Sequence, residues 1–130
     1  MARVFYLHWN RDEALEQARA LRRAGHTVTC HYSTQQPPKV RSLPDACVIS
    51  LARLPSHGRA VAEWFRESKA RRAVPLIFVG GAEEKVAQTR RGFPDALYSA
   101  PAELTKVIAR ACPARVAPRR RAEARRRIQL

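Results

Sequence analysis

Residues 46–51 read Ala-Cys-Val-Ile-Ser-Leu, a run in which only the serine is polar. A short apolar run of this kind is typical of a strand that is covered on both faces, as in the middle of a parallel sheet. A second such run, Pro-Leu-Ile-Phe-Val at residues 75–79, ends at two glycines, Gly80 and Gly81. Because the stretch between the two runs has helical periodicity, the sequence predicts two parallel strands joined by a helix.

Outward from this pair, strand and helix signals alternate in both directions along the chain. The strands are expected at residues 4–7, 27–32, 46–51, 75–79 and 96–99. The helices are expected at residues 12–24, about 59–72, 83–91 and 101–111. This alternation predicts an α/β fold of the flavodoxin-like, doubly wound class, with a five-stranded parallel sheet of order 2-1-3-4-5 and helices on both faces.

Two of the connections between strands have distinctive sequences. One face of the helix expected after the third strand carries Val61, Trp64, Phe65 and Ser68. This spacing predicts that the face packs in the core. Between the second and third strands, residues 33–44 contain two consecutive prolines and form a helix poorly. We therefore expect the second helix to be short, distorted or replaced by a loop.

The chain has 130 residues, of which 25 are Lys or Arg and 11 are Asp or Glu, so its formal net charge is +14. This length suits a single domain. Seven of the basic residues and one acid follow residue 112, so residues 113–130 carry +6 and residues 1–112 carry +8. We expect one folded domain over residues 1–112 and a basic, Arg-rich tail over residues 113–130 that is disordered in solution.

The sequence carries no sign of a metal, a disulfide framework or a membrane segment. Cys30, Cys47 and Cys112 lie far apart in apolar surroundings and match no zinc-binding spacing, so we expect reduced thiols in or near the core and no cofactor. The apolar run at residues 4–7 is too short for a signal peptide or a membrane span. These observations predict a cytoplasmic protein that does not bind a membrane.

The order and spacing of five segments resemble the response-regulator receiver domain over residues 3–111. The segments are residues 4–7, 44–50, 54–58, 75–79 and 94–101. The resemblance implies that two acidic residues after the first strand hold Mg²⁺, and that an Asp at the end of the third strand accepts a phosphoryl group. It also implies a Thr or Ser after the fourth strand and a Lys after the fifth, which sense and neutralise that group.

At each of these positions the chain carries another type of residue. The positions fall on His8 and Trp9 for the acidic pair, Ser50 for the acceptor, Gly80 for the Thr or Ser, and Ala100 for the Lys. Counting from Pro55 instead of Gly58 moves the acceptor to Leu51, which is not a carboxylate either. Imidazole and indole offer none of the oxygen ligands that Mg²⁺ requires, and an acyl phosphate needs a carboxylate. We therefore expect a degenerate receiver, or pseudo-receiver, that is not phosphorylated on Asp.

Two other combinations of residues near these positions have simpler interpretations. Asp12 and Glu13 fall in the first turn of the first helix, where the helix dipole favours carboxylates, so we interpret them as a charged helix start. His8, His57 and Ser50 combine histidine with serine, but no orienting carboxylate accompanies them. The sequence therefore predicts that the protein is not an enzyme.

Three groups of residues remain as candidates for binding. A crevice at the carboxyl ends of the strands is expected to combine His8 and Trp9 with Asn10, Arg11, Arg53, His57 and Gly81. The face that receivers use for partners corresponds here to Arg90, Tyr98, Lys106 and Arg110. The basic residues of the tail that could contact phosphates are Arg119, Arg120, Arg121, Arg125, Arg126 and Arg127.

Each group corresponds to a different function. The leading hypothesis is a non-catalytic interaction module of bacterial type, which signals by binding an unknown protein or a second copy of itself. The first alternative is weak, backbone-directed binding of nucleic acid through the tail. The second alternative is a sensor of a small anion in the crevice.

Overall fold

Five parallel strands form one sheet in the order β2-β1-β3-β4-β5, as the sequence predicts. The structure is a computed structural model and describes residues 2–32, 42–52 and 55–112. The strands are β1 (Arg3–Leu7), β2 (Thr27–His31), β3 (Ala46–Ser50), β4 (Leu76–Val79) and β5 (Leu97–Ser99). The helices are α1 (Arg11–Arg23), α2 (Pro55–Glu67), α3 (Lys69–Arg72), α4 (Glu83–Gly92), the 3-10 turn η1 (Pro101–Glu103) and α5 (Leu104–Ala111).

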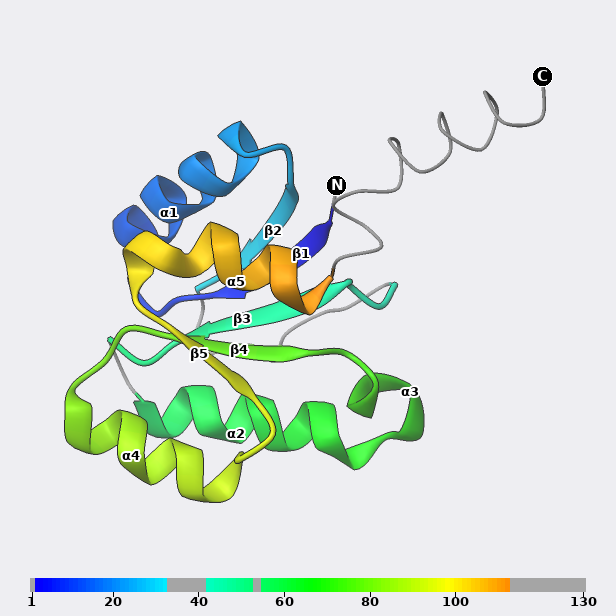
Figure 1. Cartoon of the computed structure of the whole chain (residues 1–130), viewed down its shortest axis with the longest axis vertical. Helices are drawn as coiled ribbons and strands as arrows, with labels where there is room; N and C mark the ends of the chain where they lie inside the picture. Colours follow the sequence, from blue (N-terminus) through cyan, green and yellow to red (C-terminus); the bar gives the residue numbers. More distant parts are fainter. Residues whose placement is uncertain (1, 33–41, 53–54, 113–130) are drawn as a thin grey trace.

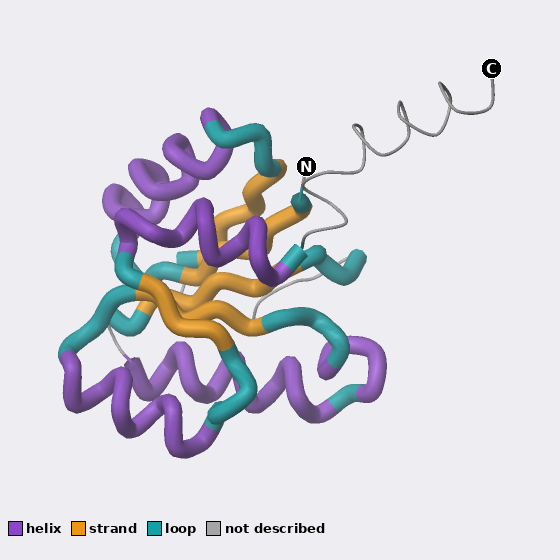
Figure 2. The backbone as a smooth tube through the Cα atoms, in the orientation of Figure 1, coloured by secondary structure: helices purple, strands orange, loops and turns teal. Residues whose placement is uncertain are grey.

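A layer of helices covers each face of the sheet (Figure 1 and Figure 2). Helices α1 and α5 lie on one face, and α2 and α4 lie on the other. Successive residues of β3 alternate between the two layers, so that Val48 packs with α1 and α5 whereas Ile49 packs with α2. Because all five residues of β3 are buried, this strand belongs to both cores.

The helix after β3 differs from the expected one at both ends. It begins earlier, at Pro55, because the fixed φ of proline suits the first position of a helix and the missing N–H is not needed there. It is interrupted at Ser68, which has an extended backbone (φ −108°, ψ 146°) and accepts a hydrogen bond on Oγ from the Arg71 N–H at 3.0 Å. Ser68 therefore caps α3 and is not part of the core face, whereas Trp64 and Phe65 pack there as predicted.

The end of the described domain is attached to the amino edge of the sheet. Helix α5 ends at Ala111, and the Cys112 thiol donates a hydrogen bond to the Asp45 carbonyl oxygen at 3.2 Å, just before β3 begins. The tail expected at residues 113–130 lies outside the described residues, as does most of the stretch for which a short helix or a loop is expected.

The cysteines agree with the sequence analysis. Cys47 and Cys112 are buried, Cys30 is half-buried, and none of the three is in a disulfide. Burial raises the pKa of both Cys30 and Cys47, which keeps these thiols protonated. Among the helices of the described residues, none is long and apolar enough to cross a membrane.

Helix α2 approaches β3 so closely that its fourth residue has to be small. A Cβ atom added to Gly58 would lie 2.7 Å from Ile49 Cγ2, well inside van der Waals contact. We expect Gly58→Ala to lower the free energy of unfolding by about 1–3 kcal/mol through overpacking, although alanine is the better helix former.

The matched control is Gly92→Ala, because a Cβ at Gly92 would meet nothing within 4 Å. Urea unfolding of the two variants should show a loss of stability for Gly58→Ala alone. Equal stabilities would show that α2 does not lie this close to β3.

Candidate functional site

A cavity of about 400 Å³ opens at the carboxyl ends of β1, β3 and β4, beside α1. This is the edge at which open parallel sheets usually bind ligands. The lining residues are Tyr6, His8, Glu13, Glu16, Gln17, Ala20, Arg23, Ser50, Ala52, Val79, Gly80 and Pro101. The structure thus brings together three of the predicted positions, His8, Ser50 and Gly80, with a carboxylate that was not expected there.

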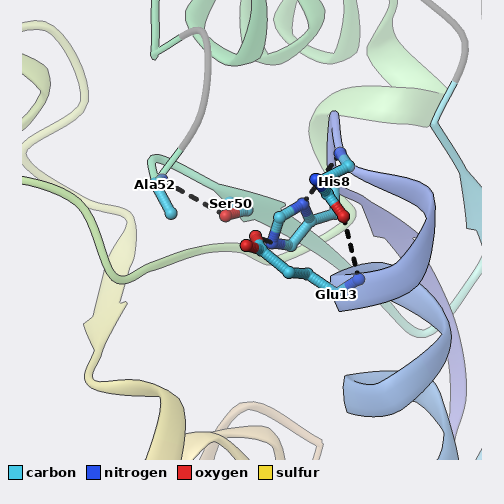
Figure 3. Close-up of polar contacts among 5 residues, drawn as sticks. His8, Glu13, Ser50 and Ala52 are labelled. Carbon is cyan, nitrogen blue, oxygen red and sulfur yellow. Dashed lines mark hydrogen bonds and ion pairs between the residues drawn. The ribbon is translucent and has the colours of Figure 1, made fainter.

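His8 is buried, with 5% of its surface exposed, and both of its ring nitrogens are engaged (Figure 3). Nδ1 accepts a hydrogen bond from the Asn10 N–H at 3.2 Å, and Nε2 lies 3.2 Å from Glu13 Oε2. A neutral imidazole has one acceptor and one donor nitrogen, so these contacts assign the proton to Nε2. The ring also stacks on Tyr6, with the two planes 11° apart.

The start of α1 positions Glu13. Asn10 has an extended backbone, and its Oδ1 accepts a hydrogen bond from the Glu13 N–H at 3.1 Å, which makes Asn10 the N-cap of the helix. Glu13 is therefore the third helical residue, a position from which a long side chain can reach back over the cap. Figure 3 shows its carboxylate extending toward the strand ends.

Both acids lie in the first turn of α1, as interpreted from the sequence; Asp12 is exposed, whereas Glu13 also contacts His8.

Ser50 is the last residue of β3 and faces the cavity, with 2% of its surface exposed. Its Oγ accepts a hydrogen bond from the Ala52 N–H at 3.2 Å. Leu51, the other candidate for the acceptor position, is buried in the core beneath α2. The ring nitrogens of His8 contact Asn10 and Glu13, so neither nitrogen is placed as a base for Ser50 even though a carboxylate accompanies the imidazole.

Tyr6 forms part of the cavity wall and remains protonated. Burial, with smaller contributions from Cys30 and Glu13, raises the pKa of the Tyr6 hydroxyl above its usual value. A protonated phenol beside a carboxylate can donate a hydrogen bond but carries no charge. Tyr6 is therefore a neutral hydrogen-bond donor in the wall of the cavity.

A second cavity, of about 410 Å³, lies between α4 and β5 and includes Gly80 again together with Ala100, the position of the receiver Lys. Its lining residues are Phe78, Gly80, Gly81, Val86, Arg90, Tyr98, Ser99, Ala100 and Pro101. Gly80 (φ 67°) and Gly81 (φ 91°) both have the left-handed backbone that favours glycine. A Cβ at Gly81 would also lie 2.6 Å from Leu51 Cβ, so this pair forms a tight exit from β4.

Trp9, Asn10, Arg11 and His57 are not among the described residues that line either cavity. Trp9 is half-buried and makes edge-to-face contacts with His57 at 4.9 Å and His31 at 6.0 Å, measured between ring centroids. Asn10 is occupied in capping α1, and Arg11 is exposed on the first turn of that helix. Arg53 lies outside the described residues. In the described part of the chain, no three His, Cys, Asp or Glu side chains gather as metal ligands.

Comparison with solved structures gives response-regulator receiver proteins. One from Pseudoalteromonas atlantica matches with a TM-score of 0.60 at 10% identity, over 86% of this chain and 98% of the other. The N-terminal domain of one from Methanoculleus marisnigri JR1 matches with a TM-score of 0.55 at 12% identity, over 85% and 95%. The bacteriophytochrome response regulator RtBRR matches with a TM-score of 0.57 at 15% identity, over 75% and 68%.

The chain has the receiver fold. No protein-family model and no curated protein matches its sequence. At identities this low, the structural matches establish the fold alone.

The contact between Glu13 and His8 should contribute measurably to stability. Replacing Glu13 with alanine removes the carboxylate that accepts from His8 Nε2 inside the cavity, and we expect the free energy of unfolding to fall by about 1–3 kcal/mol. Asp12→Ala removes a carboxylate of the same helix turn that is exposed, so its cost should stay below about 1 kcal/mol. Urea unfolding would measure both, and equal losses would mean that only the helix dipole is involved.

Proposed function

We propose that the chain is a pseudo-receiver, a signalling module that works by binding a protein partner and is not phosphorylated on Asp. The observation that carries this proposal is the content of the cavity at the carboxyl ends of the strands. Ser50 stands at the end of β3, and an imidazole paired with Glu13 stands at the end of β1. Phosphoryl transfer of the receiver type needs a carboxylate nucleophile at the end of β3, where this chain has Ser50, and a pair of acidic residues after β1 for Mg²⁺, where it has His8 and Trp9.

Phosphorylation can be tested directly. The full chain should take up no label from radioactive acetyl phosphate in the presence of Mg²⁺, because Ser50 is neither a carboxylate nor paired with a base. A receiver domain with intact acidic residues, treated in the same way, is the positive control. Label on this chain that is lost on mild alkaline hydrolysis, as an acyl phosphate would be, would refute the proposal.

The surface proposed for the partner is the edge of the sheet at β5, flanked by α4 and α5. The Arg90 guanidinium lies over the Tyr98 ring at 4.6 Å from its centroid, and the Tyr98 hydroxyl donates to the Phe93 carbonyl oxygen at 2.9 Å. The Arg90–Tyr98 pair thus lies at the surface beside the end of α4. Leu97 is 38% exposed beside it.

Three basic side chains, Arg90, Lys106 and Arg110, are exposed on this β5 surface. Arg110 is exposed on α5, where Lys106 contacts Glu103 at 3.4 Å in an exposed pair that contributes little to stability. A positively charged surface around an aromatic residue and an exposed leucine suits an acidic protein partner. We therefore infer that the partner binds with an acidic face.

Affinity capture with the full chain as bait tests this surface. A nuclease-treated lysate should yield a specific protein that binds the native chain and binds the double variant Arg90→Glu, Arg110→Glu at least tenfold more weakly. The matched control is Arg19→Glu, Arg72→Glu, which makes the same charge change at exposed positions on α1 and α3. A protein lost equally from both variants, or nucleic acid as the retained material, would contradict this surface.

A further inference from the structure

Helix α3 carries positive charge and contributes no buried residue to the core. Three of its four residues are basic: Lys69, Arg71 and Arg72. Ser68 interrupts the preceding helix and caps α3, so Glu63 and Glu67, the acids of α2, both lie before the break. The helix dipole sums over aligned peptide units, so a single turn gives little reason for three cations.

The three basic side chains of α3 remain available to a partner. Arg71 is fixed against α2, because its Nε donates a hydrogen bond to the Trp64 carbonyl oxygen at 3.0 Å and its guanidinium carbon lies 4.0 Å from the centroid of the Trp64 ring. These contacts use one of the five N–H groups of the guanidinium. Lys69 and Arg72 are exposed, and their side chains have no hydrogen bond or ion pair with any described residue.

The end of α4 lies against the end of α2 and adds a fourth cation. Arg66 of α2 has its NH1 nitrogen 2.7 Å from Asp95 Oδ2, and its guanidinium carbon is 5.7 Å from the centroid of the Phe93 ring. Phe93 is the C-cap of α4, and Arg91 is exposed in the last turn of that helix. We refer to the four cations as the α3–α4 patch: Lys69, Arg71, Arg72 and Arg91.

The α3–α4 patch has no exposed large apolar side chain. In the part of the chain that the structure describes, such side chains are Tyr32, Leu43 and Leu97, which belong to β5 or to the segments next to β2 and β3. Protein interfaces are usually organised around aromatic or apolar anchors, and helices that bind membranes insert apolar residues. Single-stranded nucleic acids stack on exposed aromatic rings. A surface that offers charge alone therefore suits the phosphates of a duplex.

We propose that the α3–α4 patch binds the phosphate backbone of double-stranded DNA without reading its sequence. Arg71 and Arg72 donate hydrogen bonds to phosphate oxygens, and Lys69 and Arg91 supply further positive charge. A duplex carries one negative charge for about each 1.7 Å of its axis, so several of these side chains can meet phosphates at once. Contacts to phosphates fix the position of a protein on DNA but carry no sequence information.

This inference goes beyond the proposed protein–protein function. The α3–α4 patch shares no residue with the Arg90 and Arg110 positions tested on the β5 surface, and the capture of a protein partner is carried out after nuclease treatment. Either assignment can therefore fail while the other holds.

Fluorescence anisotropy of a labelled duplex, titrated with the full chain, provides the test. We expect a Kd that rises steeply with salt between about 50 and 200 mM and that agrees within about threefold between duplexes of unrelated sequence. The double variant Lys69→Gln, Arg72→Gln should weaken binding about tenfold at the low-salt end. It should also lower the slope of log Kd against log salt by about 2, because each lost phosphate contact removes about 0.9.

The matched control is Arg11→Gln, Arg19→Gln. It removes two charges from exposed positions on α1, which lies on the opposite side of the sheet from α3 (Figure 1). The two double variants have the same net charge, and both keep residues 113–130. The control should retain the Kd within about twofold, with the salt slope of the native chain.

Several results would overturn the proposal. Equal losses from the two double variants would show that net charge, and not the α3–α4 patch, is responsible, and the absence of binding at the lowest salt would also refute it. Tighter binding of a single-stranded oligonucleotide would exclude the duplex. Poly-glutamate, or vesicles of phosphatidylserine and phosphatidylcholine, would reassign the patch to an acidic protein or a membrane if either competed as well as unlabelled duplex. Circular dichroism of each variant shows whether it is folded.

Discussion

A strand that is buried on both faces can form hydrogen bonds only along its two edges, and this constraint organises the rest of the molecule. All five residues of β3 are buried, so β1 and β4 must pair with it on either side, and a helical layer must cover each face. The apolar run at residues 46–51 therefore determines the topology around it. The close approach of α2 at Gly58 and the cavity at the end of β3 both follow from that burial.

Strand order and the position of each helix could be predicted, because apolar periodicity reports directly on which faces are covered. The interruption of the third helix could not be predicted from periodicity. Ser68 has the spacing of a core residue, and only its side-chain hydrogen bond to the Arg71 N–H shows that it caps a new turn. A serine at this spacing can either face the core or cap a new helical turn, and the free energies of the two arrangements differ little.

The candidate site was predicted in part, for a similar reason. The sequence places His8 and Ser50 at the ends of neighbouring strands, since parallel strands end at the same edge. It does not show which of Asp12 and Glu13 turns inward, because both suit a helix N-terminus. The Asn10 cap decides which acid faces the cavity. It fixes the residue at which α1 begins, and with it the direction in which each side chain of the first turn points. An asparagine three residues before a glutamate was the available signal, since this spacing allows the glutamate side chain to reach back over the cap.

The Cys112–Asp45 contact has a spatial consequence for the whole chain. It fixes the last described residue at the amino edge of the sheet, whereas the cavity of His8 and Ser50 opens at the carboxyl edge. Cys112 therefore lies at the end of the sheet opposite the cavity. The length of the strands separates Cys112 from the cavity, so a macromolecule bound beside Cys112 need not block the entry of a small molecule to the cavity.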